Sequence, residues 1–175
     1  SQMDNMLHVG IMHSFNSLGQ MFLNGQIELA VNNLVYLSEC DEVGLGTSKT
    51  RKGRPISRET AIGILELYKN IPKIGQYGLR HLGQIQLLVD NIAKDRICDI
   101  SCSLIKSFLI DYTIDQCKRY KIPMRMTKTS WYNKKKNNII TEKVELPINE
   151  ESKQAILFVP KRWLRYTPWL NYDDY

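Results

Sequence analysis

Hydrophobic residues recur every three or four positions over the first part of the chain, between residues 3 and 37. This spacing places them on one face of a helix and is typical of an amphipathic helix that packs on a core. Asn24 and Gly25 interrupt the pattern, and this dipeptide favours a turn. We therefore predict two amphipathic helices here, from these recurring apolar residues: Met6, Val9, Leu18, Phe22, Ile27, Ala30, Leu34 and Leu37.

The helical spacing returns after Ser57 and continues to about residue 120. Ser57 suits the N-cap of a helix over residues 58–70, which Pro72 ends, and a second helical segment is predicted over about 74–92. One long helix is then predicted over about 96–120, because apolar side chains cover more than a narrow stripe of it. We expect this long helix to be central and to be contacted on several sides.

The pattern changes from helical to alternating after Pro123. Residues 124–132, 137–148 and 154–160 are predicted as three strands that polar and basic turns connect. A short helix is expected to begin at Pro160. These elements add a small sheet to the C-terminal side of the helices.

The complete pattern predicts an α+β fold in a single domain over residues 1–175. A helical N-terminal two-thirds surrounds the long central helix of about 96–120, and a small antiparallel β-sheet follows over about 124–160. The chain begins with Ser1 rather than Met, so it is compatible with a piece of a longer protein that has a further flanking domain. No apolar run approaches the roughly 18 residues of a membrane span, so we expect no membrane contact and a cytoplasmic location.

The distribution of charge changes this picture more than the total does. The net charge is +6, yet the first 48 residues contain no Lys or Arg and carry −5, so the remainder carries +11. A segregated basic surface attracts phosphate backbones, although many basic surfaces are merely solvated. We therefore expect nucleic acid as a partner.

Basic residues gather in two regions that we interpret as nucleic-acid-binding. The first is the glycine-bearing loop before Ser57, where the candidate contacts are Arg51, Lys52 and Arg54. The second is the predicted hairpin, which combines aromatic and basic side chains in the way of single-strand-binding surfaces. Its candidate contacts are Lys128, Trp131, Lys134, Lys135 and Lys136. A lysine-rich hairpin tip is also a common way to keep a sheet edge soluble.

Acidic residues in two places suggest a site for phosphate chemistry. Asp95 and Asp99 lie four residues apart at the start of the predicted long helix and share one face. Together with Glu42 they are candidate ligands of Mg²⁺, which prefers carboxylate oxygens and retained water. Candidate catalytic residues are Lys49, Glu42 and Asp99, which would steady the phosphate and activate water. N-capping by Asp95 and an ion pair of Asp99 are the structural alternatives.

Other catalytic chemistries find no support in the sequence. None of the three histidines lies in a recognisable Ser-His-Asp or Cys-His context. The four cysteines lack a CxxC pattern, so we interpret them as reduced thiols in the core. A zinc site that includes Cys98 and Cys102 is the alternative interpretation.

Three segments resemble a family of bacterial proteins associated with restriction, phage-defence or mobile-element genes. They are EVGLGTSKTRKGRPIS, DRICDISCSLIKSFLIDYTIDQC and ELPINEESKQAILFVPKRWL, and the likeness extends over roughly residues 38–175. The positions that carry the resemblance are Glu42, Gly46, Ser48, Lys49, Gly53, Asp95 and Asp99. The resemblance implies a nuclease-like or defence role, without an established activity.

Three functional hypotheses follow from these features. The leading one is a metal-dependent, nuclease-like effector of bacterial defence type that hydrolyses phosphodiesters. The alternatives are a non-catalytic nucleic-acid-binding module and an interaction subunit, which should expose an apolar face in its first 48 residues. Convergence of the three acids near Lys49 would favour the enzyme, whereas burial of Asp99 against an arginine would favour a structural role.

Overall fold

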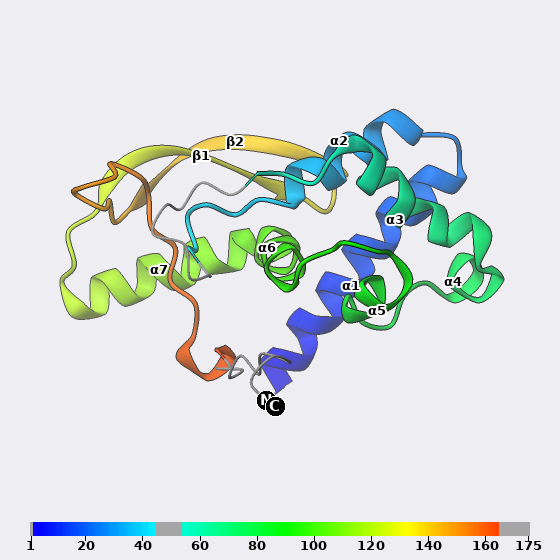
Figure 1. The fold of residues 1–175 in the computed structure, drawn as a ribbon. Coiled ribbons are helices and arrows are strands. Elements are labelled where there is room, and N and C mark those ends of the chain that lie inside the picture. The colour runs from blue at the N-terminus through cyan, green and yellow to red at the C-terminus, as the bar shows by residue number, and fades with distance from the viewer. Residues whose placement is uncertain (1, 45–53, 165–175) are drawn as a thin grey trace, which may run out of the picture.

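The computed structural model describes residues 2–44 and 54–164, and over these residues the helices precede a two-stranded sheet (Figure 1). The elements are α1 (Gln2–Leu23), α2 (Ile27–Leu37), α3 (Arg58–Asn70), α4 (Pro72–Tyr77), α5 (Gly83–Leu88), α6 (Lys94–Leu104), α7 (Lys106–Tyr120), β1 (Arg125–Asn133), β2 (Asn138–Leu146) and the 3₁₀ helix η1 (Lys161–Trp163). The predicted α+β fold with a helical N-terminal part is confirmed.

The first core takes buried residues from each of the helices α1 to α6. The predicted break between α1 and α2 is confirmed, and it contains Gly25 at φ +86°, a conformation that costs glycine little. The predicted N-cap of α3 is also confirmed, because the Ser57 hydroxyl accepts a hydrogen bond from the Thr60 N–H at 3.1 Å. Phe15 and Leu34 are fully buried in this core.

The predicted helix over 74–92 is wrong, because the chain forms two short helices, α4 and α5, instead. The Asn16 side chain of α1 explains the interruption. Its Nδ2 donates to the Leu79 carbonyl at 3.0 Å, and its Oδ1 accepts from the Leu79 N–H at 2.8 Å. Gly78, at φ +75°, caps α4 and lets the chain reach this position. Since Asn16 binds both backbone groups of Leu79, a helix cannot continue through it.

The predicted long helix over 96–120 is also wrong as a single element. It is divided at Ile105, which has φ −107° and ψ 16°, into α6 and α7. Leu104 belongs to the first core, whereas Ile105 and Leu109 belong to a second core beneath the hairpin. The break lets the two helices serve different cores, and Figure 1 shows α6 along its axis while α7 runs below the strands.

The sheet has two strands rather than the predicted three. β1 and β2 pair antiparallel over nine residues each. Residues 154–160 do not join the sheet, and Ala155 in this segment forms an isolated bridge with Ile148. Further along, the Leu157 N–H donates to the Glu42 carbonyl at 2.8 Å, so this segment pairs with the loop after α2.

Two smaller observations complete the fold. The short helix predicted after Pro160 is the 3₁₀ helix η1. Cys40, Cys102 and Cys117 are buried free thiols as predicted, whereas Cys98 is exposed and not part of the core. Among the helices of residues 2–44 and 54–164, none combines the length and the apolar character needed to cross a membrane.

Candidate functional site

Glu42 follows α2 and is held by a buried lysine. Lys106 Nζ lies 2.6 Å from Glu42 Oε1, and the Lys106 side chain is only 8% exposed. The Thr129 hydroxyl of β1 donates to the same carboxylate oxygen at 3.3 Å. A buried ammonium is costly unless an anion compensates it. The Glu42 carboxylate supplies that compensation at the junction of α6 and α7.

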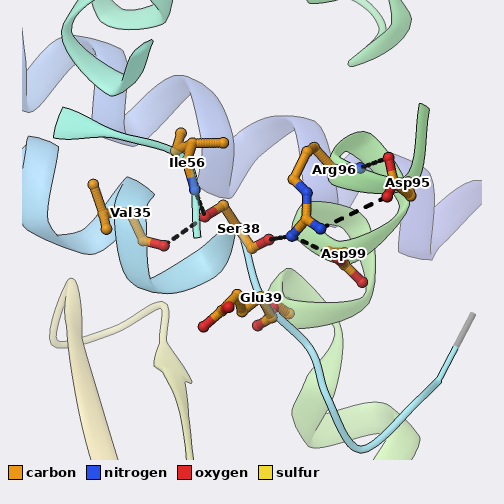
Figure 2. Close-up of polar contacts among 8 residues, drawn as sticks. Val35, Ser38, Glu39, Ile56, Asp95, Arg96 and Asp99 are labelled. Atoms are coloured by element: carbon orange, nitrogen blue, oxygen red, sulfur yellow. Dashed lines mark hydrogen bonds and ion pairs between the residues drawn. The ribbon is translucent and has the colours of Figure 1, made fainter. Parts of the chain in front are cut away.

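Arg96 ties the start of α6 to the end of α2 (Figure 2). Its Nη1 donates to the Ser38 carbonyl at 3.2 Å and to Asp99 Oδ2 at 3.3 Å. Its Nη2 lies 3.6 Å from Asp95 Oδ2. One guanidinium therefore serves two carboxylates and a backbone carbonyl, and we call these four residues the Arg96 cluster.

Ser38 extends the Arg96 cluster to the chain before α3. The buried Ser38 hydroxyl donates to the Val35 carbonyl at 2.7 Å and accepts from the Ile56 N–H at 2.9 Å. Ser103 of α6 donates to the Glu39 carbonyl at 2.9 Å. These contacts fix the two ends of the segment between α2 and α3, as Figure 2 shows for Ser38 and Ile56.

Asp99 titrates unusually within the Arg96 cluster. Burial raises the pKa of its carboxyl group from 3.8 to about 6, the Arg96 guanidinium opposes this rise, and the charges of Asp95, Asp41 and Glu39 add to it. Desolvation outweighs the attraction of Arg96, whose guanidinium is shared between Asp95 and Asp99. The charge of Asp99 therefore changes in mildly acidic solution.

The three predicted Mg²⁺ ligands do not meet in one group. Glu42 pairs with Lys106, whereas Asp95 and Asp99 share the arginine. Within residues 2–44 and 54–164, no three His, Cys, Asp or Glu side chains are placed to hold a metal ion. The predicted catalytic Lys49 lies outside the described residues. The arrangement of Asp99 matches the structural alternative, and a Mg²⁺ site stays a prediction.

An open pocket of about 460 Å³ lies beside the buried charge pair. The charged residues that line its described walls are Glu39, Asp41, Glu42 and Lys106. Three carboxylates against one ammonium repel a phosphate group. The pocket therefore does not favour direct contact with a nucleic-acid backbone.

The hairpin carries lysines that have no anionic partner among the described residues. Lys134, Lys135 and Lys136 occupy the turn between β1 and β2, and all three are exposed; we call them the lysine turn. Lys128 and Lys143 lie directly opposite each other across the strands, an arrangement in which like charges destabilise a hairpin. None of the five forms an ion pair in the described part of the chain. An anionic partner would relieve this repulsion.

The other predicted nucleic-acid contacts are placed differently. Trp131 is half-buried and packs against the second core, so it is not part of the surface that the exposed hairpin lysines form. Arg54 is exposed. Arg51 and Lys52 lie outside the described residues.

The apolar face that an interaction subunit should expose is present on α1. Met3, Met6 and Val9 are 50%, 68% and 58% exposed, and their spacing of three places them along one side of the helix. Lys134 lies at the end of this stripe, beside Gly10. If Gly10 had a side chain, its Cβ would lie 2.9 Å from Lys134 Nζ. Within the described residues no element covers the stripe, and an interaction subunit stays a prediction.

Sequence reasoning missed the partners of Glu42. Lys106 interrupts an apolar run from Leu104 to Ile110, and a charged residue in such a run signals a buried pair. Thr129 gave no such signal, because a threonine is ordinary in a strand.

Comparison with known proteins identifies a family but no activity. A family model described as a domain of unknown function, DUF8370, matches residues 1–171. No curated protein and no solved structure matches the chain. The chemistry of the site therefore rests on the residues of this chain.

Proposed function

The chain belongs to the DUF8370 family, and we propose that it is a nucleic-acid-binding module whose hairpin contacts the phosphate backbone. The observation that carries the proposal is the set of five hairpin lysines without an anionic partner in the described residues. Residues 125–146 contain six basic and two acidic residues. Lysine neutralises phosphates without reading sequence, so we expect salt-dependent binding with little base preference.

Binding is better supported than hydrolysis, because the candidate catalytic acids are already engaged. Glu42 compensates buried Lys106, and Asp99 is half-buried against Arg96. A metal-dependent nuclease needs carboxylates that converge on an open coordination position. The non-catalytic alternative therefore takes precedence over the nuclease hypothesis.

The proposal is tested by fluorescence anisotropy with labelled duplex DNA, single-stranded DNA and RNA. Because the sequence resembles restriction and phage-defence proteins, the labelled probes are taken from plasmid and phage DNA sequences. Reversing all charges of the lysine turn, Lys134→Glu, Lys135→Glu and Lys136→Glu, should weaken binding on the order of 100-fold, because three phosphate contacts become repulsive.

A matched control reverses three exposed cations of the helical part, Lys69→Glu, Lys73→Glu and Arg80→Glu. This variant has the same net charge as the first, so it should lose only the long-range part of the attraction. Equal losses in the two variants would contradict a binding surface on the hairpin.

A cleavage assay separates the module from an enzyme. Each nucleic acid is incubated with the protein in Mg²⁺ or Mn²⁺ and examined for shorter products. We expect no products from the purified protein. Cleavage that Glu42→Gln and Asp99→Asn both abolish would instead establish the nuclease hypothesis.

A further inference from the structure

A hollow of about 290 Å³ lies at the open end of the hairpin, opposite the lysine turn. Figure 1 shows the chain that rises from α7 to β1 beside the segment that follows β2. The residues that line the hollow are Pro123, Met124, Arg125, Ile148, Glu150 and Lys153.

The hollow has two cations that are free to meet an anion. Arg125 and Lys153 are exposed, and neither forms an ion pair with a described residue. Glu150 lines the same hollow without pairing with either of them in the described structure. The side chains of the lining therefore carry a net positive charge, with one carboxylate opposing it.

The backbone adds donors and a fixed turn. Asn149 orders the turn, since its Oδ1 accepts from the Glu151 N–H at 2.9 Å and its carbonyl accepts from the Lys153 N–H at 2.8 Å. Lys153 is held at φ +58°. The N–H groups of Met124 and Glu150 have no acceptor among the described residues. Free amides beside cations are the usual components of an anion site.

We propose that this hollow binds a phosphate group, with Arg125 and Lys153 as its cationic ligands. The chemistry is shared by a phosphomonoester and by a phosphate of a nucleic-acid backbone. The site does not require the lysine turn, so it stands or fails separately from the proposed function.

A second pocket in the helical part provides the internal control. It has about 390 Å³ and two exposed cations, Lys73 and Arg80, in its lining. There, however, the N–H groups of Arg80 and His81 already donate to Gln84 Oε1, at 2.7 Å and 3.0 Å. Because the amides of Arg80 and His81 are already engaged, this pocket should bind phosphate more weakly than the hollow at Arg125.

The test is a titration of the ¹⁵N-labelled protein with inorganic phosphate, followed by amide shifts in ¹H–¹⁵N spectra. We expect saturable shifts at Met124 and Glu150 and weaker shifts near Lys73. Arg125→Gln or Lys153→Gln should weaken binding about 3- to 5-fold, in line with one exposed charge pair. Glu150→Gln should strengthen it by a similar factor, because it removes the opposing carboxylate.

Two further titrations, one with glycerol phosphate and one with a short oligonucleotide, identify the kind of phosphate compound that the hollow binds. Saturable shifts at Met124 and Glu150 with either compound support the site and show which source it accepts. The proposal is overturned if inorganic phosphate moves no amide of the hollow, if the shifts at Lys73 are as large, or if Glu150→Gln weakens binding.

Discussion

The Glu42–Lys106 pair lies where α6 meets α7, in the wall of the open pocket. The Lys106 side chain is 8% exposed and the Glu42 side chain 22%. Replacing such a pair by apolar side chains is often nearly neutral, whereas removing one partner leaves the other uncompensated. The pair therefore gives Glu42 a structural role, the compensation of a buried lysine.

The double-mutant cycle of this pair tests that role. Glu42→Gln should lower the free energy of unfolding by about 3 kcal/mol, because Lys106 stays buried without its anion. The double variant Glu42→Gln with Lys106→Met should recover most of the loss. Urea unfolding followed by circular dichroism measures both. A Glu42→Gln protein as stable as the parent would show that the carboxylate is not needed for the fold.

Asp99 should make stability depend on pH. Its pKa is 3.8 ordinarily and about 6 in the folded protein, so the folded state binds the proton more tightly. Protonation therefore stabilises the fold, and this contribution is lost as the pH rises from about 4 through 6.

Asp99→Asn imitates the protonated group and should remove that dependence. Above pH 7 the variant should be more stable than the parent by about 1–3 kcal/mol, from a shift of roughly two pKa units. Thermal unfolding between pH 4 and pH 8 measures the difference. A variant that is less stable than the parent at pH 8 would mean that the Arg96 ion pair outweighs the cost of burial.

At the residue scale, the sequence identified the acids but not their partners. Asp95 and Asp99 could be placed on one helix face, because helical spacing is local. Glu42 and Lys106 are 64 positions apart in the sequence, so only the tertiary fold brings them into contact. A carboxylate that binds metal and one that neutralises a buried lysine look alike in sequence.

At the element scale, local signals set the starts of helices, and distant side chains set their interruptions. Ser57 caps α3 through its own neighbour Thr60, so its role was predictable. The break at Gly78 depends on Asn16, and the break at Ile105 depends on the division between two cores. Neither cause is local, so periodicity alone predicted helices that were too long. The third strand was overpredicted for the same reason, because its backbone pairs elsewhere.

Two glycine substitutions test this account of the elements. Gly78→Ala should destabilise the protein by about 1–3 kcal/mol, since alanine is strained at this backbone conformation. Its Cβ would also lie 2.5 Å from Asn16 Nδ2. Gly63→Ala, inside α3 with nothing within 4 Å of its Cβ, should instead stabilise by about 0.5–1 kcal/mol. Equal effects in thermal unfolding would show that Asn16 does not determine the end of α4.

At the scale of the whole molecule, the basic hairpin is the feature on which the proposed function depends. The Lys-free first 48 residues build much of the helical core, and the hairpin carries six basic residues. The hairpin turn packs beside these helices, because Asn33 of α2 donates to the Asn137 carbonyl and Lys134 approaches Gly10 of α1. The lysine turn and the hollow at Arg125 lie at opposite ends of the hairpin. Nine-residue strands separate these ends by roughly 30 Å. A nucleic acid that lies along the hairpin could meet both.

The salt dependence of DNA binding is the most direct measurement of the central claim. Each phosphate contact contributes about −0.9 to the slope of log K against log salt for duplex DNA. Replacing Lys134, Lys135 and Lys136 together by glutamine should make that slope shallower by about 2 to 3, at unchanged thermal stability. A slope identical to that of the parent would contradict the proposal that the lysine turn contacts the phosphate backbone.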